Sequence, residues 1–239
     1  MSEIKALFFD VFGTVVDWRT GVKEHLIKNL PSDKADLKDS VDWDTLVQDW
    51  RTAYFKFTVA NSKSDASAPV FVTIDQQYTA SIGPILKEYG IDSVWDDGQH
   101  EELARAWHYL GGWPDSVEGL TKLKSKYIIS TLSNGNVRLL VDMAKYAGLP
   151  WDVVFGGDVF KIYKPSPKVY LGAAELLNLK PENVLMVAAH FYDLEAAKKY
   201  GLQTAYVVRQ GEDTGITVTP DQVDYFAQNF FDLYDQLTK

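Results

Sequence analysis

The 239-residue sequence contains no cysteine, which excludes disulfide bonds, thiolate-bound metals and cysteine nucleophiles. It has no apolar run near the roughly 20 residues needed to cross a bilayer, and it lacks the pattern of a secretory leader. Basic residues are outnumbered, with 24 Lys and Arg against 33 Asp and Glu and a net charge of −9. We therefore expect a cytoplasmic protein that binds neither a membrane nor a nucleic acid.

Hydrophobic residues, by contrast, make up 46% of the chain, enough for one large domain or a core domain with a smaller one. Short apolar runs typical of buried strands lie at residues 7–9, 127–132, 153–155, 184–188 and 204–208. From residue 114 onward they alternate with helical patterns at 137–146, 169–177 and 194–200. This alternation predicts an α/β fold, a doubly wound, Rossmann-like parallel sheet with helices on both faces.

Residues 17–95 break the alternation, because their patterns are helical and include no clear strand. Residues 61–68, rich in Ser, Lys and Asp, have the composition of a loop. One helical face carries Trp43, Leu46, Val47, Trp50 and Tyr54. We therefore predict a helical cap domain of residues 17–95 inserted after the first strand, and a core domain of residues 1–16 and 96–239. Such a cap would lie over the carboxyl ends of the strands.

Polar signals occur at or just beyond the expected strand ends. They are Asp10, followed by Gly13-Thr14; Ser133-Asn134; Lys164, with Tyr170 in the next helix; and His190 with Asp193. Each is weak alone, since Asp10 is also typical of a capping or turn acid and Lys164 of a solvated surface lysine. Because the carboxyl ends of parallel strands meet at one edge of a sheet, the set together indicates a site there.

In this order the signals resemble the motifs of the haloacid dehalogenase superfamily, specifically its type II (S)-2-haloacid dehalogenases, over nearly the whole chain. The resemblance implies that Asp10 is the nucleophile and Thr14 its hydroxyl partner. It assigns Ser133 and Asn134 to the second motif, Lys164 and Tyr170 to the third, and Asp193 to the fourth. Within the cap, Trp50-Arg51 is similar to a Trp-Arg pair whose arginine faces the substrate.

Two departures from the superfamily's phosphatases bear on the reaction. Phosphatases carry a second Asp two residues after the nucleophile, where this chain has Phe12, which has no proton to transfer. They also usually place an acidic metal ligand where this chain has Ala189. The oxygen ligands of a Mg²⁺ site are thus depleted, and we expect no metal and no other cofactor. A Mg²⁺-dependent phosphatase acting on a small phosphoester remains the alternative, and a non-catalytic binding module is a second one.

The fourth motif also departs from the dehalogenase pattern. Dehalogenases often have Ser-Ser-Asn where this chain has Ala188-Ala189-His190, so a hydroxyl near Lys164 is lost and an amide becomes an imidazole. This difference leaves the substrate range and the activation of water open.

The resemblance implies a two-step hydrolysis of a short 2-haloalkanoic acid. Asp10 would attack C2 and release halide, and water would then cleave the aspartyl ester to give a 2-hydroxy acid. Lys164 would keep Asp10 ionised, and Asp193 and His190 are candidates to orient or deprotonate the water. The expected substrate and halide contacts are Phe12, Arg51, Ser133, Asn134 and Tyr170. The expected partners are the haloacid and halide, and the resemblance also allows a homodimer.

Overall fold

A parallel sheet of six strands forms the centre of the computed structural model, which describes residues 2–63 and 70–239. The strands are β1 (Ala6–Phe9), β2 (Ile128–Leu132), β3 (Val153–Phe155), β4 (Val184–Ala188), β5 (Gln203–Val207) and β6 (Tyr225–Ala227). Their order is β3-β2-β1-β4-β5-β6, and every neighbouring pair is parallel. The predicted α/β fold is confirmed. Because β1 lies between β2 and β4, the sheet is wound in both directions from its first strand.

Helices cover both faces of this sheet. They are α6 (Ser116–Lys124), α7 (Val137–Ala147) and α11 (Phe230–Leu237) on one face, and α9 (Pro167–Leu176) and α10 (Phe191–Lys199) on the other. Alternate residues of β1 serve the two faces, since Leu7 and Phe9 join one hydrophobic cluster and Ala6 and Phe8 the other. All four side chains are fully buried, as expected for a strand covered on both sides.

The five apolar runs of the sequence correspond to β1 through β5, with ends that agree to within one residue. The sequence pattern missed β6, which has three residues and pairs only with β5 at the edge of the sheet. Two of those residues, Tyr225 and Phe226, are half-buried. An edge strand this short lacks the continuous apolar run that marks a central strand.

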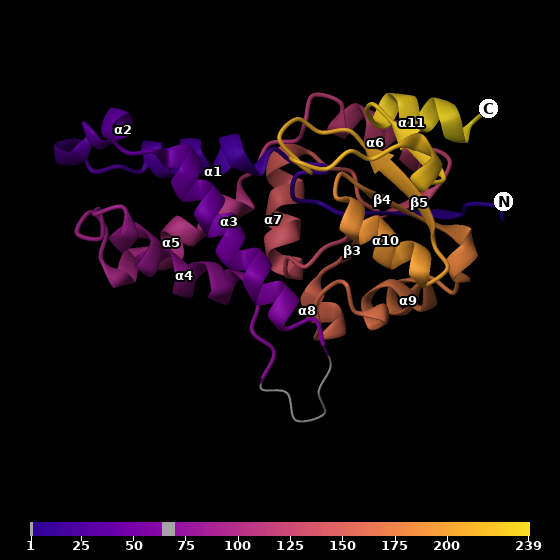
Figure 1. Ribbon diagram of the computed structural model, residues 1–239, viewed down its shortest axis with the longest axis horizontal. Coiled ribbons are helices and arrows are strands. Elements are labelled where there is room, and N and C mark those ends of the chain that lie inside the picture. Colours follow the sequence, from indigo (N-terminus) through magenta and orange to yellow (C-terminus); the bar gives the residue numbers. More distant parts are fainter. Residues whose placement is uncertain (1, 64–69) are drawn as a thin grey trace.

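Between β1 and α6 lies a group of helices that Figure 1 shows to the left of the sheet, with both chain termini at the opposite end of the molecule. They are α1 (Trp18–Lys28), α2 (Leu37–Ser40), α3 (Trp43–Ala60), α4 (Ile74–Glu88) and α5 (His100–Ala104). Residues 17–63 and 70–95 contain no strand, as their patterns predicted. The domain boundaries of residues 17–95 remain a proposal, and α5, which follows them, packs against α4.

The predicted loop of residues 61–68 is described only as far as residue 63, where it leaves α3, and the remainder lies outside the described residues. A short helix, α8 (Gly157–Phe160), follows β3. No helix in the part of the chain that the structure describes is long and apolar enough to cross a membrane.

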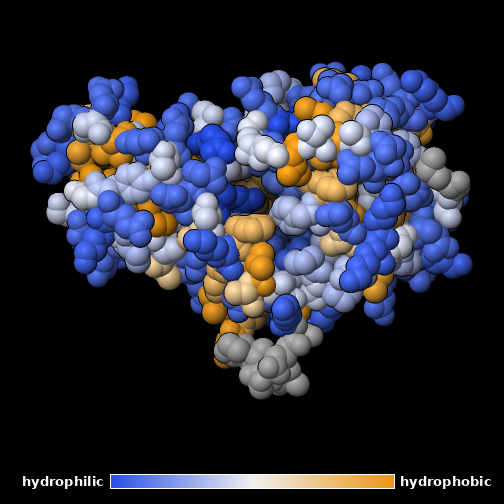
Figure 2. Space-filling model, viewed as in Figure 1, coloured by the Kyte–Doolittle hydropathy of each residue, from blue (hydrophilic) through white to orange (hydrophobic). Residues whose placement is uncertain are grey.

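Helix α3 packs against α1 and α4 within the helical group, and its Phe57 contacts Tyr163 in the rest of the molecule. Asp42 caps its first turn by accepting a hydrogen bond from the backbone N–H of Thr45. The predicted apolar face is buried at all five positions, from Trp43 to Tyr54. Figure 2 shows a mainly hydrophilic surface on which hydrophobic side chains gather in patches, one of them over the C-terminal end of α3, where Phe55 is 43% exposed.

Candidate active site

Asp10 follows β1 directly, at the carboxyl edge of the sheet. Its backbone N–H donates to the carbonyl of Val187 (3.0 Å), which continues the pairing of β1 with β4. The chain then turns sharply at Gly13, whose φ of +84° favours glycine. The Asp10 side chain is only 10% exposed.

Both carboxylate oxygens of Asp10 accept hydrogen bonds. Oδ1 accepts from the Lys164 ammonium (3.0 Å), while Oδ2 accepts from the Thr14 hydroxyl (2.9 Å) and from His190 Nδ1 (2.9 Å). Burial would raise the pKa of Asp10, but the charge of Lys164 and the hydrogen bond from His190 outweigh it and hold that pKa well below its usual range. Asp10 is therefore ionised, and Oδ1, with one donor, keeps a lone pair free.

Lys164 links Asp10 to a second carboxylate, Asp193. The ammonium donates to Asp193 Oδ2, and the hydroxyl of Tyr170 donates to Oδ1 (2.5 Å). Burial and the charge of Asp10 raise the pKa of Asp193, although Lys164 acts in the opposite direction. Asp193 is therefore the carboxylate of the pair that takes up a proton more readily. Asn134 holds the backbone of Lys164, since its Oδ1 accepts a hydrogen bond from the Lys164 backbone N–H (2.7 Å).

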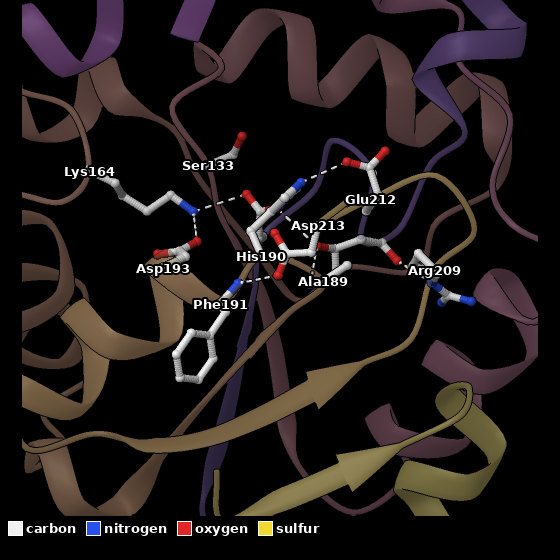
Figure 3. Close-up of polar contacts among 12 residues, drawn as sticks. Ser133, Lys164, Ala189, His190, Phe191, Asp193, Arg209, Glu212 and Asp213 are labelled. Atoms are coloured by element: carbon white, nitrogen blue, oxygen red, sulfur yellow. Dashed lines mark hydrogen bonds and ion pairs between the residues drawn. The ribbon is translucent and has the colours of Figure 1, made fainter. Parts of the chain in front are cut away.

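His190 lies between two carboxylates (Figure 3). Its Nδ1 is 2.9 Å from Asp10 Oδ2 and its Nε2 is 2.8 Å from Glu212 Oε2. Burial would lower the pKa of His190, but the hydrogen bonds and charges of the two carboxylates outweigh it and raise that pKa to about 9. Both ring nitrogens therefore carry protons and donate, and His190 is an imidazolium at neutral pH.

Arg51 supplies a cation on the side of α3. Its guanidinium carbon lies 4.3 Å from the ring centre of Tyr54 and 5.1 Å from that of Phe12. Its Nη1 is buried, and among the described residues it has no hydrogen-bond partner. Arg51, His190 and Glu212 all line a cavity of about 380 Å³. A buried donor without an acceptor beside such a cavity is suited to bind an anion.

Most of the site residues expected from the sequence are connected by hydrogen bonds, and the others lie beside the connected group or apart from it. Six form one continuous hydrogen-bonded network, namely Asp10, Thr14, Lys164, Tyr170, His190 and Asp193. Asn134 joins it through the lysine backbone, and Phe12 and Arg51 contact each other. Ser133 is buried just after β2, and its Oγ accepts from the backbone N–H of Gly135 (3.1 Å) rather than joining the network.

Sequence reasoning missed Glu212, which contacts His190 and also accepts a hydrogen bond from Trp18 Nε1 (2.7 Å). Its neighbour Asp213 accepts from the backbone N–H of Phe191, the first residue of α10 (2.8 Å). A weak signal was present, because Gly211-Glu212-Asp213 lies in the loop after a buried strand, β5. Four residues separate Glu212 from the end of β5, so the rule that selected polar residues directly at the strand ends did not select it.

A family model for haloacid dehalogenase-like hydrolases matches residues 4–201. The chain belongs to this family of hydrolases, as its fold and the network around Asp10 lead one to expect.

Within the family the similarity is to dehalogenases of 2-haloacids. The solved structure of a defluorinating L-2-haloacid dehalogenase is 43% identical with a TM-score of 0.87, covering 99% of this chain and 96% of that one. A second L-2-haloacid dehalogenase is 36% identical with a TM-score of 0.85, covering 98% of this chain and all of that one (100%). The (S)-2-haloacid dehalogenase 4A of Burkholderia cepacia is 29% identical over 88% of this chain and 86% of its own. The predicted resemblance to type II (S)-2-haloacid dehalogenases is confirmed.

Proposed function

We propose that this protein hydrolyses short 2-haloalkanoic acids to 2-hydroxy acids through a covalent ester on Asp10. One observation carries the proposal. Asp10 is a buried, ionised carboxylate with a free lone pair on Oδ1, and the residue two places on, Phe12, has no proton to give a leaving group. A halide leaves without a proton, whereas the alkoxide of a phosphoester needs one. The named activities of the relatives support the same reaction.

In the first step, Oδ1 of Asp10 attacks C2 of the substrate, and the halide leaves with the bonding electron pair. The unpartnered Nη1 of Arg51 would hold the halide as its charge grows. The side-chain N–H groups of Asn134 would assist, because its oxygen is already occupied by Lys164. The hydroxyl of Ser133 accepts one hydrogen bond and keeps its proton for the substrate carboxylate. Phe12 would form part of the pocket wall.

In the second step, water attacks Cγ of the ester, and its proton passes to Asp193. Asp193 suits this role because its pKa is raised, whereas His190 already holds both of its protons. Negative charge develops on Oδ2 of Asp10, where the Thr14 hydroxyl and His190 donate. Lys164, at Oδ1, protonates the departing alkoxide of the product. The direct contact between Asp193 and Lys164 then returns that proton to the lysine. The second proton of the water remains on the regenerated Asp10 carboxyl group, which releases it to solvent because the pKa of Asp10 is low.

The phosphatase alternative is not favoured by the same geometry. The Asp10 oxygens, which would bind Mg²⁺, already face two cations, Lys164 and His190. A metal ion there would meet their repulsion, and Ala189 provides no carboxylate in compensation. Within residues 2–63 and 70–239, no group of three or more His, Asp or Glu side chains is arranged to hold a metal ion. Independence of metal and cofactor remains a prediction.

Halide release tests the proposed function. We expect bromide or chloride from the 2-halopropionates and haloacetates, undiminished by EDTA, and no phosphate from phosphoesters. Mass spectrometry of acid-quenched enzyme should find the acyl adduct on Asp10. In a single turnover in ¹⁸O-labelled water, the first product should carry no label, because its new oxygen comes from Asp10. Label in that first product would mean direct attack by water and would refute the ester mechanism.

The cellular location and the assembly are also proposals. The family resemblance supports an enzyme of the cytoplasm, and it also supports a homodimer. Fractionation of cells and light scattering of the purified protein test these two points.

A further inference from the structure

We propose that Glu212 is a positioning residue for the second step, holding His190 as an imidazolium whose Nδ1–H points at Oδ2 of Asp10. This inference rests on the proposed function, because it concerns the hydrolysis of the ester on Asp10. It adds to the site a residue that none of the polar strand-end signals includes.

The carboxylate of Glu212 is held rigidly. Oε2 accepts from His190 Nε2 (2.8 Å) and Oε1 accepts from Trp18 Nε1 (2.7 Å), so each oxygen has its own donor. The carboxyl group also packs over the turn that follows Asp10, because a Cβ placed on Gly13 would come within 2.5 Å of the Glu212 carboxyl carbon. Glu212 is only 10% exposed. A carboxylate fixed on both oxygens can fix the orientation of the imidazole that it contacts.

Among the described residues, few titratable groups face His190, and they come from several elements. They are Asp10 after β1, Glu212 and Asp213 after β5, Tyr192 on α10, Lys164 beside Asp10, and Arg51 on α3, whose charge reaches Glu212. Within residues 2–63 and 70–239, only Asp10 and Glu212 bond to the ring. Burial would raise the pKa of Glu212, but the hydrogen bond and charge of His190 outweigh it and lower that pKa. Glu212 is therefore ionised at neutral pH, where His190 is charged.

The contribution of Glu212 changes during the reaction. In the free enzyme two carboxylates stabilise the charge of His190, but once Asp10 has become an ester it is neutral. In the part of the chain that the structure describes, Glu212 is then the only carboxylate that still bonds to the buried ring. Without it, burial would favour a neutral imidazole. The oxyanion forming on Oδ2 would then lose a charged donor at the moment it needs one.

The first step has no such dependence, because Asp10 is still ionised when it attacks the substrate. Removing the charge of Glu212 should therefore slow the hydrolysis of the ester much more than its formation. This asymmetry separates a positioning role from a structural one, since a distorted site would slow both steps.

The test compares Glu212→Gln with the wild-type enzyme. We expect a burst of halide close to one equivalent, an acyl adduct on Asp10 that accumulates, and a kcat lower by about 100-fold. The ratio kcat/KM should stay within a few-fold of wild type, because it reports the steps up to halide release. The imidazole of His190, followed by NMR, should titrate at a lower pH than its value of about 9 in the wild type.

Two variants control the comparison. Glu212→Asp keeps a carboxylate and should recover part of the lost kcat. Glu195→Gln removes a carboxylate from an exposed position on α10 and should leave the kinetics and the titration of His190 unchanged.

The outcomes distinguish this inference from the function on which it rests. An adduct in the wild type that does not increase in Glu212→Gln, or an unchanged His190 titration, would overturn the role of Glu212 and leave the dehalogenase function intact. If no haloacid leaves an adduct on the wild-type enzyme, the proposed function fails and the inference fails with it.

Discussion

Two histidines of this protein each lie between two carboxylates, one in the site and one far from it in the chain. His108 is 3.0 Å from Asp142 through Nδ1 and 3.1 Å from Asp75 through Nε2, distances close to those around His190. Its carboxylates raise the pKa of His108 against the effect of burial. The local arrangement is thus nearly the same in both places, and its consequences differ because of what surrounds the carboxylates.

Around His108 the carboxylates are partly hydrated and occupied by other protein donors. Asp75, on α4, is 34% exposed and accepts from Asn136, while Asp142, on α7, is 20% exposed and accepts from Arg138. This cluster joins the helical group to the helices on the sheet. Around His190 both carboxylates are only 10% exposed, and one of them, Asp10, directly follows the central strand β1 and has a lone pair free on Oδ1. The histidine is bonded in the same way in both clusters. The burial of the carboxylates and their other hydrogen bonds therefore distinguish the reactive site around His190 from the structural interface around His108.

Asp10→Asn should have the largest effect, a loss of turnover of at least about 10⁴-fold, because an amide is a far poorer nucleophile toward C2. The matched change in the other cluster, Asp75→Asn, should leave the rate of halide release within a few-fold of wild type. Thermal unfolding of both variants should show that they are folded. Comparable losses in the two variants would contradict the distinction between the clusters.

Lys164→Met should come next, with a loss of about 10³-fold. The change leaves two buried carboxylates, Asp10 and Asp193, without the cation that stabilises their charges. The pKa of Asp10 should rise, so the acidic limb of the pH–rate profile should move to higher pH. Lys168→Met, at an exposed position on α9, is the control and should change neither the rate nor the profile. An acidic limb that stays in place would mean that Lys164 does not set the ionisation of Asp10.

The pH dependence of kcat sharpens the comparison further. His190 must be protonated to donate to Asp10, and kcat reports the ester, in which Asp10 is neutral and no longer raises the pKa of His190. We therefore expect kcat to fall as the pH rises through a value below about 9, the pKa of His190 in the free enzyme. The loss should approach tenfold for each pH unit above that value. His108→Gln should show the same limb, because His108 does not contact the reacting carboxylate. A profile that rises through pH 9 would indicate that a neutral His190 acts as the base.

Much of this site could be predicted from the sequence, because its members follow apolar runs. Asp10, Ser133 and His190 each come just after a strand, and a parallel sheet brings such positions to one edge. The state of His190 could not be predicted in this way. Its proton depends on Glu212, which lies on a loop after β5, and Glu212 is in turn held by a tryptophan 194 residues away in the chain.

The same limit applies to β6 and to His108. A strand of three residues, two of them half-buried, leaves no periodic signal, and the partners of His108 are more than 30 residues away on either side. Such contacts arise from packing between elements, and the spacing of residues within one element does not encode them. The sequence therefore predicted where the chemistry lies better than the protonation of the groups that perform it.

The smallest predicted effect concerns stability. The pKa of His108 in the folded protein is raised above its unfolded value, so its stabilising contribution is fully present below about pH 6.5 and is lost as the pH rises through the folded value. Because Asp75 and Asp142 are partly hydrated, this contribution should be about 1 kcal/mol or less. Urea unfolding at pH 5.5 and 8.5 measures it, and His108→Gln should remove that part of the pH dependence while halide release at neutral pH is retained. A variant with the full pH dependence of the wild type would show that His108 does not stabilise this interface through its charge.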